Sequence, residues 1–251
     1  MVMRYSPKKR YFLLSAKLRE RVGALADFTR ILAIREVNLL EGRVHVSDAS
    51  EGYVAFFVEA TNPRVDADFL EQMLKGSSFL ETLTVVEGKD GMIVDSASFP
   101  MVSGLGRRSI LLDADSARDL IYRLTEKLGT GAGDIVYQLG VEYGSNAWSG
   151  AVGGLVMGEE SLQLYLQLFE AVGMGKVRLE EFREGDPSMV VSVERLFECN
   201  GLSSSSPRSF FFRGALAGIA GSLFGREMSA REVVCVASGA KRCRFEVSPR
   251  T

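Results

Sequence analysis

The sequence contains few of the residues that hydrolytic enzymes and metal sites use most often. A single histidine occurs among the 251 residues, at position 45, and this scarcity argues against a Ser-His-Asp triad, a Cys-His pair and an HExxH motif. We expect His45 to be a strand residue in a half-exposed sheet. The glycine-containing segments 104–106 and 129–133 match neither a P-loop nor a dinucleotide-binding pattern. The sequence therefore predicts no catalytic residues and no enzyme.

Positive charge and long apolar runs are also lacking. The chain has 30 Lys and Arg residues against 32 Asp and Glu residues, a net charge of -2, whereas nucleic-acid binders usually carry a basic excess. The most apolar stretch, residues 210–224, contains Arg213 and is shorter than the ~20 residues that cross a bilayer. The N-terminus shows no signal-peptide pattern. We expect a cytoplasmic protein that binds neither nucleic acid nor membrane, with reduced thiols.

Hydrophobic patterning is typical of a globular protein with one large domain or two ordinary ones. In the first part of the chain, β-rich runs alternate with segments of helical spacing. Strands are predicted at 11–18, 37–46, 53–60 and 82–86, and helices at 23–36 and 66–75. The order β-α-β-β-α-β is that of ferredoxin-like domains.

A turn-forming segment at residues 88–91 marks the predicted boundary, so we expect domains at 1–90 and 91–251. In the second domain, helices come before strands. Helices are predicted at 116–128 (with Asp115 or Ser116 as N-cap), 134–148, 161–172 and 208–223, and strands at 176–183, 188–197, 233–237 and 242–247. This order predicts an α+β domain with an antiparallel sheet.

The cysteines are the most informative chemical feature. All three, Cys199, Cys235 and Cys243, lie near the C-terminus, and the last two flank the predicted hairpin. Glu232 precedes Cys235 by three residues and is a possible fourth ligand. Three thiolates and a carboxylate suit a closed tetrahedral zinc site. The alternative is that the cysteines are small buried hydrophobic residues, since no CxxC pair is present.

The residues around this set resemble the 4-vinyl reductase domain family. The matching motifs are Gly140-xxx-Gly144, Gly173-x-Gly175-Lys176-Val177, Gly214-Ala215-Leu216-Ala217-Gly218, Gly225 and Glu232-xx-Cys235-xxx-Gly239-xxx-Cys243-x-Phe245. The resemblance covers roughly residues 92–247 and implies the fold of the TRAPP vesicle-tethering subunits. It also implies one structural zinc ion held by Cys199, Glu232, Cys235 and Cys243.

Members of this family include accessory proteins of bacteriochlorophyll synthesis and sensor domains of aromatic-responsive transcription activators. The resemblance to the sensors implies an apolar ligand pocket with a few polar anchors, among them a histidine and a tryptophan. This domain has no histidine, which argues against recognition of a phenol. The aromatic residues that could line a cavity are Tyr137, Tyr143, Trp148 and Tyr165, and the candidate ligand-binding residues among them are Trp148 and Tyr143. Aromatic residues at helical spacing are also typical of a core.

Residues 1–90 resemble an ACT domain. The matching residues are Arg21-Val22-Gly23-Ala24-Leu25 and Val37-Asn38-Leu39-Leu40. The resemblance implies binding of an amino acid or other small molecule, usually at a dimer interface. Free N–H groups at the helix start, exposed by Gly23, favour a carboxylate, and the candidate contacts are Arg21, Val22, Gly23 and Asn38. The alternative is that Gly23 only ends a turn and the domain dimerises without ligand.

Together these features predict a ligand-responsive regulatory protein with one structural zinc. We expect a homodimer whose output passes through a protein partner, because no helix-turn-helix or basic recognition helix is evident. The alternatives are a reductase or accessory protein of tetrapyrrole metabolism, and a dimeric scaffold.

Overall fold

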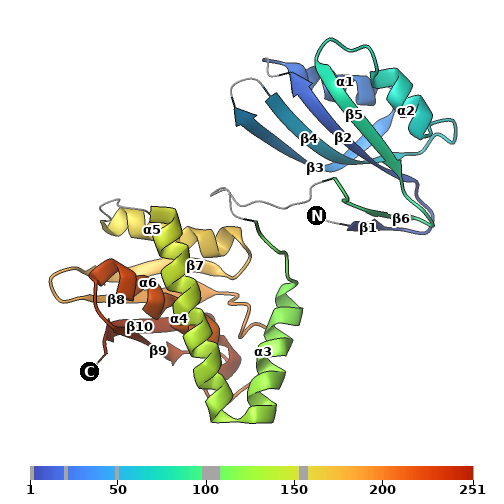
Figure 1. The fold of residues 1–251 in the computed structure, drawn as a ribbon. Helices are drawn as coiled ribbons and strands as arrows, with labels where there is room; N and C mark the ends of the chain where they lie inside the picture. The colour runs from blue at the N-terminus through green and yellow to red at the C-terminus, as the bar shows by residue number, and fades with distance from the viewer. Residues whose placement is uncertain (1–2, 20–21, 49–50, 98–107, 153–157, 251) are drawn as a thin grey trace. The chain divides into compact units, whose positions relative to one another are not determined.

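The computed structural model describes residues 3–19, 22–48, 51–97, 108–152 and 158–250 (Figure 1). The chain divides into two compact units, Met1–Met101 and Val102–Thr251. The glycine-containing segment 104–106 lies outside the described residues. Within the described residues, no helix combines the length and the apolar character needed to cross a membrane.

The first unit has the predicted ferredoxin-like order. Its main elements are β2 (Tyr11–Arg19), α1 (Ala24–Ile34), β3 (Val37–Asp48), β4 (Glu51–Ala60), α2 (Ala67–Leu74) and β5 (Leu80–Glu87). These strands form one antiparallel sheet in the order β3-β4-β2-β5. His45 is an exposed residue of β3, so the expectation of a strand position is confirmed.

Every second side chain of the central strand β2 points into the main core of this unit. Phe12 and Leu14 are fully buried and lie in one cluster with Phe28 of α1 and Leu70 of α2. Residues two apart in a strand point to the same face, so β2 presents a continuous apolar row to both helices. The helix α2 begins at Asp66, whose carboxylate accepts a hydrogen bond from the Phe69 N–H at 2.7 Å.

A two-stranded ribbon that the sequence analysis missed adds to the first unit. It pairs β1 (Met3–Tyr5) with β6 (Met92–Val94), and buried Ile93 joins Tyr11 and Leu13 in a second, smaller core cluster. The predicted boundary at residues 88–91 is therefore wrong, because the chain returns to this unit after the turn. Gly91 has φ +74°, a backbone conformation that favours glycine and lets the chain reverse here.

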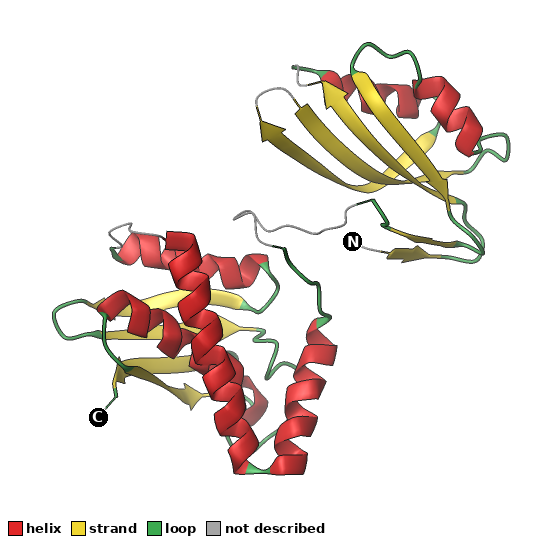
Figure 2. Ribbon diagram, viewed as in Figure 1, coloured by secondary structure: helices red, strands yellow, loops and turns green. Residues whose placement is uncertain are grey.

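The second unit is α+β, as predicted. Its elements are α3 (Ala114–Leu128), α4 (Thr130–Val152), α5 (Glu159–Ala171), β7 (Lys176–Arg183), β8 (Ser188–Glu194), α6 (Phe210–Phe224), β9 (Met228–Val234), the short 3-10 helix η1 (Val236–Ser238) and β10 (Cys243–Pro249). The strands form an antiparallel sheet in the order β7-β8-β10-β9. Figure 2 shows α4, α5 and α6 together on one face of this sheet.

Two predicted features of the second unit need correction. The strand predicted at 233–237 is β9, which starts earlier and contains Glu232, whereas Cys235 follows the strand and leads into η1. The N-cap of α3 is Asp113, not Asp115 or Ser116, because its carboxylate accepts from the Ser116 N–H at 2.8 Å.

The two central helices, α4 and α6, meet backbone to backbone. A Cβ atom added at Gly144 would lie 2.1 Å from the Ala215 carbonyl oxygen, and one added at Gly214 would lie 2.0 Å from the Tyr137 carbonyl oxygen. Gly140 and Gly218 face equally close backbone atoms. Glycine lowers intrinsic helix stability, so its presence here reflects the need for close packing.

We predict that Gly144→Ala destabilises the protein by about 1–3 kcal/mol, because the added methyl group forces the two helices apart. Gly131→Ala is the matched control in the same helix, since nothing lies within 4 Å of its Cβ position. The control should be neutral or stabilising by up to about 1 kcal/mol. Thermal unfolding followed by circular dichroism measures both changes, and a Gly144→Ala protein as stable as the parent would contradict the packing argument.

Candidate metal centre

Four buried side chains come together at one end of the second sheet. Cys199 lies in the turn after β8, Glu232 in β9, Cys235 directly after β9, and Cys243 at the start of β10. Their three sulfur atoms and one carboxylate oxygen all lie within 4.8 Å of one another. The structure thus assembles the complete set of ligands expected from the sequence.

The distances within this cluster suit a single ion. The sulfur atoms of Cys199 and Cys235 are 3.6 Å apart, and Cys199 Sγ lies 3.9 Å from Glu232 Oε1. Ligand atoms bound at about 2.3 Å around a tetrahedral ion are separated by about 3.7 Å. A disulfide would need sulfur atoms about 2.05 Å apart, and all three cysteines are free.

The protonation of these groups is tightly coupled. Burial raises the pKa of Glu232 to about 7. Hydrogen bonding with Cys235 and Cys243 raises the pKa of Cys199, whereas hydrogen bonding with Cys199 and Cys243 lowers the pKa of Cys235. Four anionic ligands in one buried site repel one another strongly unless a cation lies between them. The donor set therefore fits a divalent, thiophilic metal ion, which binds deprotonated thiols.

A second buried carboxylate, which the sequence analysis missed, lies beside the cluster. Glu198 is 2% exposed, and its two oxygens accept hydrogen bonds from the Phe211 and Phe212 N–H groups at 2.8 and 2.7 Å. Glu232 Oε2 also accepts from the Ser209 N–H at 3.2 Å. Burial raises the pKa of Glu198 to about 8, although these two N–H donors favour the charged form. Both carboxylates thus satisfy free N–H groups at the start of α6.

A sequence signal for Glu198 does exist. It is the acidic member of the otherwise apolar run Leu196-Phe197-Glu198-Cys199. A charged residue in such a run requires a buried partner, but the sequence alone does not show that the partner is a helix start more than ten residues further along.

The ACT candidate residues lie around the start of α1. Gly23 occupies the N-cap position with φ +89°, and both Val22 and Gly23 are exposed. Arg21 lies outside the described residues. Asn38 lines a shallow hollow of about 440 Å³ between α1 and β3, together with residues that include Thr29. Val22 and Gly23 are not among the residues that line it.

The aromatic candidates of the second unit have different environments. Trp148 is buried and packs edge-on against Tyr165, with ring centroids 4.7 Å apart, so it belongs to the core. Tyr143 is partly exposed and lies 5.2 Å from Phe211, between ring centroids. Burial of the ring raises the pKa of Tyr143. A role for either residue in ligand binding stays a prediction.

Protein-family models match one segment in each unit. The model of the V4R domain family matches residues 189–249, a range that contains all four cluster residues. The model of the ACT domain family matches residues 12–75, which contain Gly23 and Asn38. No curated protein matches the chain.

Several solved structures are similar to this chain. The phenol-responsive sensory domain of the transcription activator PoxR, solved with phenol, is 19% identical over 57% of this chain and 77% of that chain, with a TM-score of 0.46. A vinyl-4-reductase family protein from Methanocaldococcus jannaschii is 20% identical over 57% and 85%, with a TM-score of 0.43. Trafficking protein particle complex subunit 3 from Naegleria fowleri, covalently bound to palmitic acid, is 8% identical over 55% and 95%, with a TM-score of 0.43.

The family matches confirm both resemblances derived from the sequence, and they follow each other in the expected order. The protein carries an ACT domain followed by a V4R domain.

Proposed function

We propose that this chain is a ligand-responsive regulatory protein in which one structural zinc ion stabilises the V4R domain. The buried cluster of three cysteines and one glutamate carries the proposal, because its members come from separate segments that only the fold unites. The combination of an ACT domain with a V4R domain supports a role in binding small molecules.

The composition of the cluster supports zinc in a structural role. Three thiolates and one carboxylate fill the tetrahedral shell that zinc prefers, which leaves no coordination position for water or substrate. When bound, the ion would supply positive charge that stabilises the deprotonated ligands. We infer a binding function rather than a catalytic one.

The cluster residues would hold three parts of the domain together. Cys199 belongs to the turn that precedes α6, whereas Cys235 directly follows β9 and Cys243 begins β10. Glu232 adds a link to the start of α6 through the Ser209 N–H. Loss of the ion should therefore loosen the turn, the sheet end and the helix start together.

Each domain is proposed to bind its own small molecule. In the ACT domain, the exposed Gly23 adopts a left-handed conformation at the start of α1, where N–H groups favour the carboxylate of an amino acid. Arg21, Val22 and Asn38 are the proposed neighbours. In the V4R domain, an apolar or aromatic metabolite is proposed, with Trp148 and Tyr143 as contacts.

A homodimer is part of this proposal, with output through a protein partner. Exposed apolar residues recur at every fourth position along three helices of the V4R domain. Such rows support the proposal that another protein chain covers this surface. They are Leu120, Leu124 and Leu128 on α3, Ile135, Leu139 and Tyr143 on α4, and Leu164 and Leu168 on α5 with Val172 directly after its end. A second copy of the chain presents the same three rows, which makes a self-complementary contact feasible.

The zinc proposal is tested by elemental analysis of the protein purified under reducing conditions. We expect about one zinc per chain, as a closed four-ligand site requires. Glu232→Gln should lose most of the zinc, because a neutral amide replaces an anionic ligand. Glu198→Gln is the matched control: it changes an equally buried neighbouring carboxylate outside the ligand set and should keep the zinc while lowering the melting temperature.

Two results would refute the zinc proposal. The first is a parent protein that binds no zinc after refolding with an excess of the ion. The second is zinc content that is lost equally in both glutamate variants, since this would show a general effect of unfolding.

The amino-acid site is tested by isothermal titration calorimetry with the twenty standard amino acids. We expect Gly23→Val to abolish binding, because the side chain would fill the space in front of the α1 N–H groups. Gly76→Val is the matched control, since Gly76 has φ +87° and carries the same backbone strain away from α1. A parent protein without affinity for any amino acid would remove this site from the proposal.

Light scattering tests the dimer. We expect a mass of twice the 27.5 kDa chain for the parent protein. A Leu120→Lys and Leu124→Lys double variant should shift the population toward the monomer, because buried lysines are costly at an apolar interface. Arg123→Glu on the same helix is the control. A parent that stays monomeric at all concentrations would exclude the dimer.

A further inference from the structure

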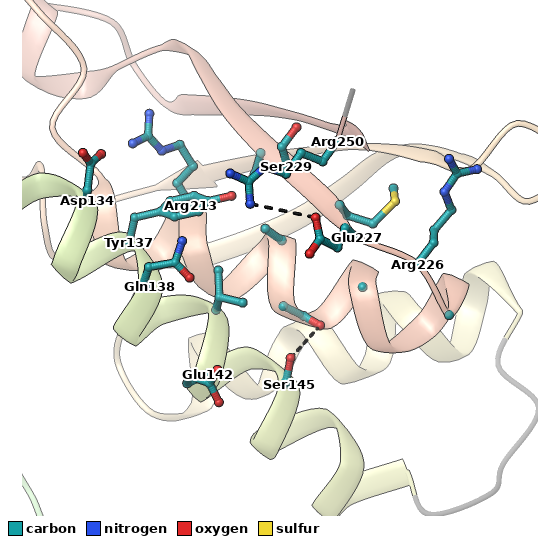
Figure 3. A pocket seen from close by; sticks show the side chains of 17 residues that line it. Asp134, Tyr137, Gln138, Glu142, Ser145, Arg213, Arg226, Glu227, Ser229 and Arg250 are labelled. Atoms are coloured by element: carbon teal, nitrogen blue, oxygen red, sulfur yellow. Dashed lines mark hydrogen bonds and ion pairs between the residues drawn. The ribbon is translucent and has the colours of Figure 1, made fainter.

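A polar cleft of about 890 Å³ opens on the V4R domain (Figure 3). It is bounded by α4 on one side and by the start of β9 on the other, and α6 forms its floor. The floor consists of short residues, Ala217, Gly218 and Gly221. None of the four cluster residues lines the cleft. Its volume is within the range of small-molecule sites.

One cation in this cleft has an unused donor. The guanidinium of Arg213 lies 5.2 Å from the ring centroid of Tyr137 and 5.6 Å from that of Phe210, so two aromatic rings hold it. Its Nε is buried and has no hydrogen-bond partner among the described residues. Because this Nε is occluded, a ligand in the cleft would pair with the terminal N–H groups of the guanidinium, which is a charged donor.

The charges around Arg213 indicate which acceptor fits. A guanidinium presents parallel N–H groups that match the two oxygens of a carboxylate. Arg226 and Arg250 also line the cleft, but the same lining contains Asp134, Glu142 and Glu227. These acidic groups disfavour a doubly charged anion such as phosphate more than a singly charged one.

We propose that this cleft binds a small organic carboxylate, with Arg213 as the residue that pairs with the carboxylate group. The aromatic rings of Tyr137 and Phe210 restrict the guanidinium to one orientation, and this preorganisation lowers the entropic cost of binding. The short floor residues leave room for the body of the ligand between α4 and β9. No residue that lines the cleft belongs to the cysteine cluster or to the ACT domain.

Isothermal titration calorimetry on the full chain tests this proposal with benzoate as the probe. Benzyl alcohol serves as a neutral analogue and inorganic phosphate as a different anion. We expect benzoate to bind, benzyl alcohol to show no binding, and phosphate to bind more weakly than benzoate. Arg213→Gln should weaken benzoate binding about tenfold or more, the effect of losing a charge-assisted hydrogen bond.

Two further variants make the result specific. Arg213→Lys keeps the charge but not the forked donor, so benzoate affinity should fall between those of the parent and Arg213→Gln. Arg178→Gln removes an exposed arginine of β7 outside the cleft and should leave affinity unchanged. Zinc content is measured on each sample, so that loss of the metal is distinguished from loss of this site.

Three outcomes would overturn the proposal. The first is that the parent protein has no affinity for benzoate. The second is that the parent and a folded Arg213→Gln variant bind benzoate with equal affinity. The third is that phosphate binds more tightly than benzoate. Circular dichroism melting curves establish that each variant is folded.

Discussion

The V4R domain depends on the direct contact between the backbones of α4 and α6. Glycines on both helices let each main chain approach carbonyl oxygens of the other, as at Gly144 and Gly214. This contact places the start of α6 against the turn that bears Cys199, where Glu198 accepts from its first N–H groups. It also brings Tyr137 of α4 next to Arg213 of α6. The cluster of three cysteines and one glutamate and the cleft thus both depend on this helix contact.

Two buried glutamates have different tasks at the same helix start. Both oxygens of Glu198 accept hydrogen bonds from N–H groups of α6, and Glu198 is not a member of the cluster of candidate ligands. Glu232 directs one oxygen to the Ser209 N–H and the other to Cys199 Sγ. Because one side chain serves both the helix and the cluster, the position of α6 and the geometry of the ligands are mechanically coupled.

Most of the elements could be predicted from local patterns. The strand Lys176–Arg183 and the β-α-β-β-α-β order agree with the structure because alternation and helical spacing report burial directly. The ribbon of β1 and β6 was missed because short strands carry too little periodicity, and only pairing between the two ends of the unit defines them. The resulting error in the domain boundary has the same cause.

The sequence by itself determined which side chains are candidate metal ligands, three cysteines and Glu232, and it contained the glycines that permit close helix packing. The spacing between Cys235 and Cys243 already favours an arrangement in which their sulfur atoms lie close together, since the chain reverses direction between them. Only the tertiary structure decided that Cys199 lies beside Cys235 and Cys243, and that Glu198 accepts hydrogen bonds from the first N–H groups of α6. It also decided that Arg213 faces a cleft. These contacts connect residues far apart in sequence, and local propensity contains no information about which distant groups become neighbours when the core closes.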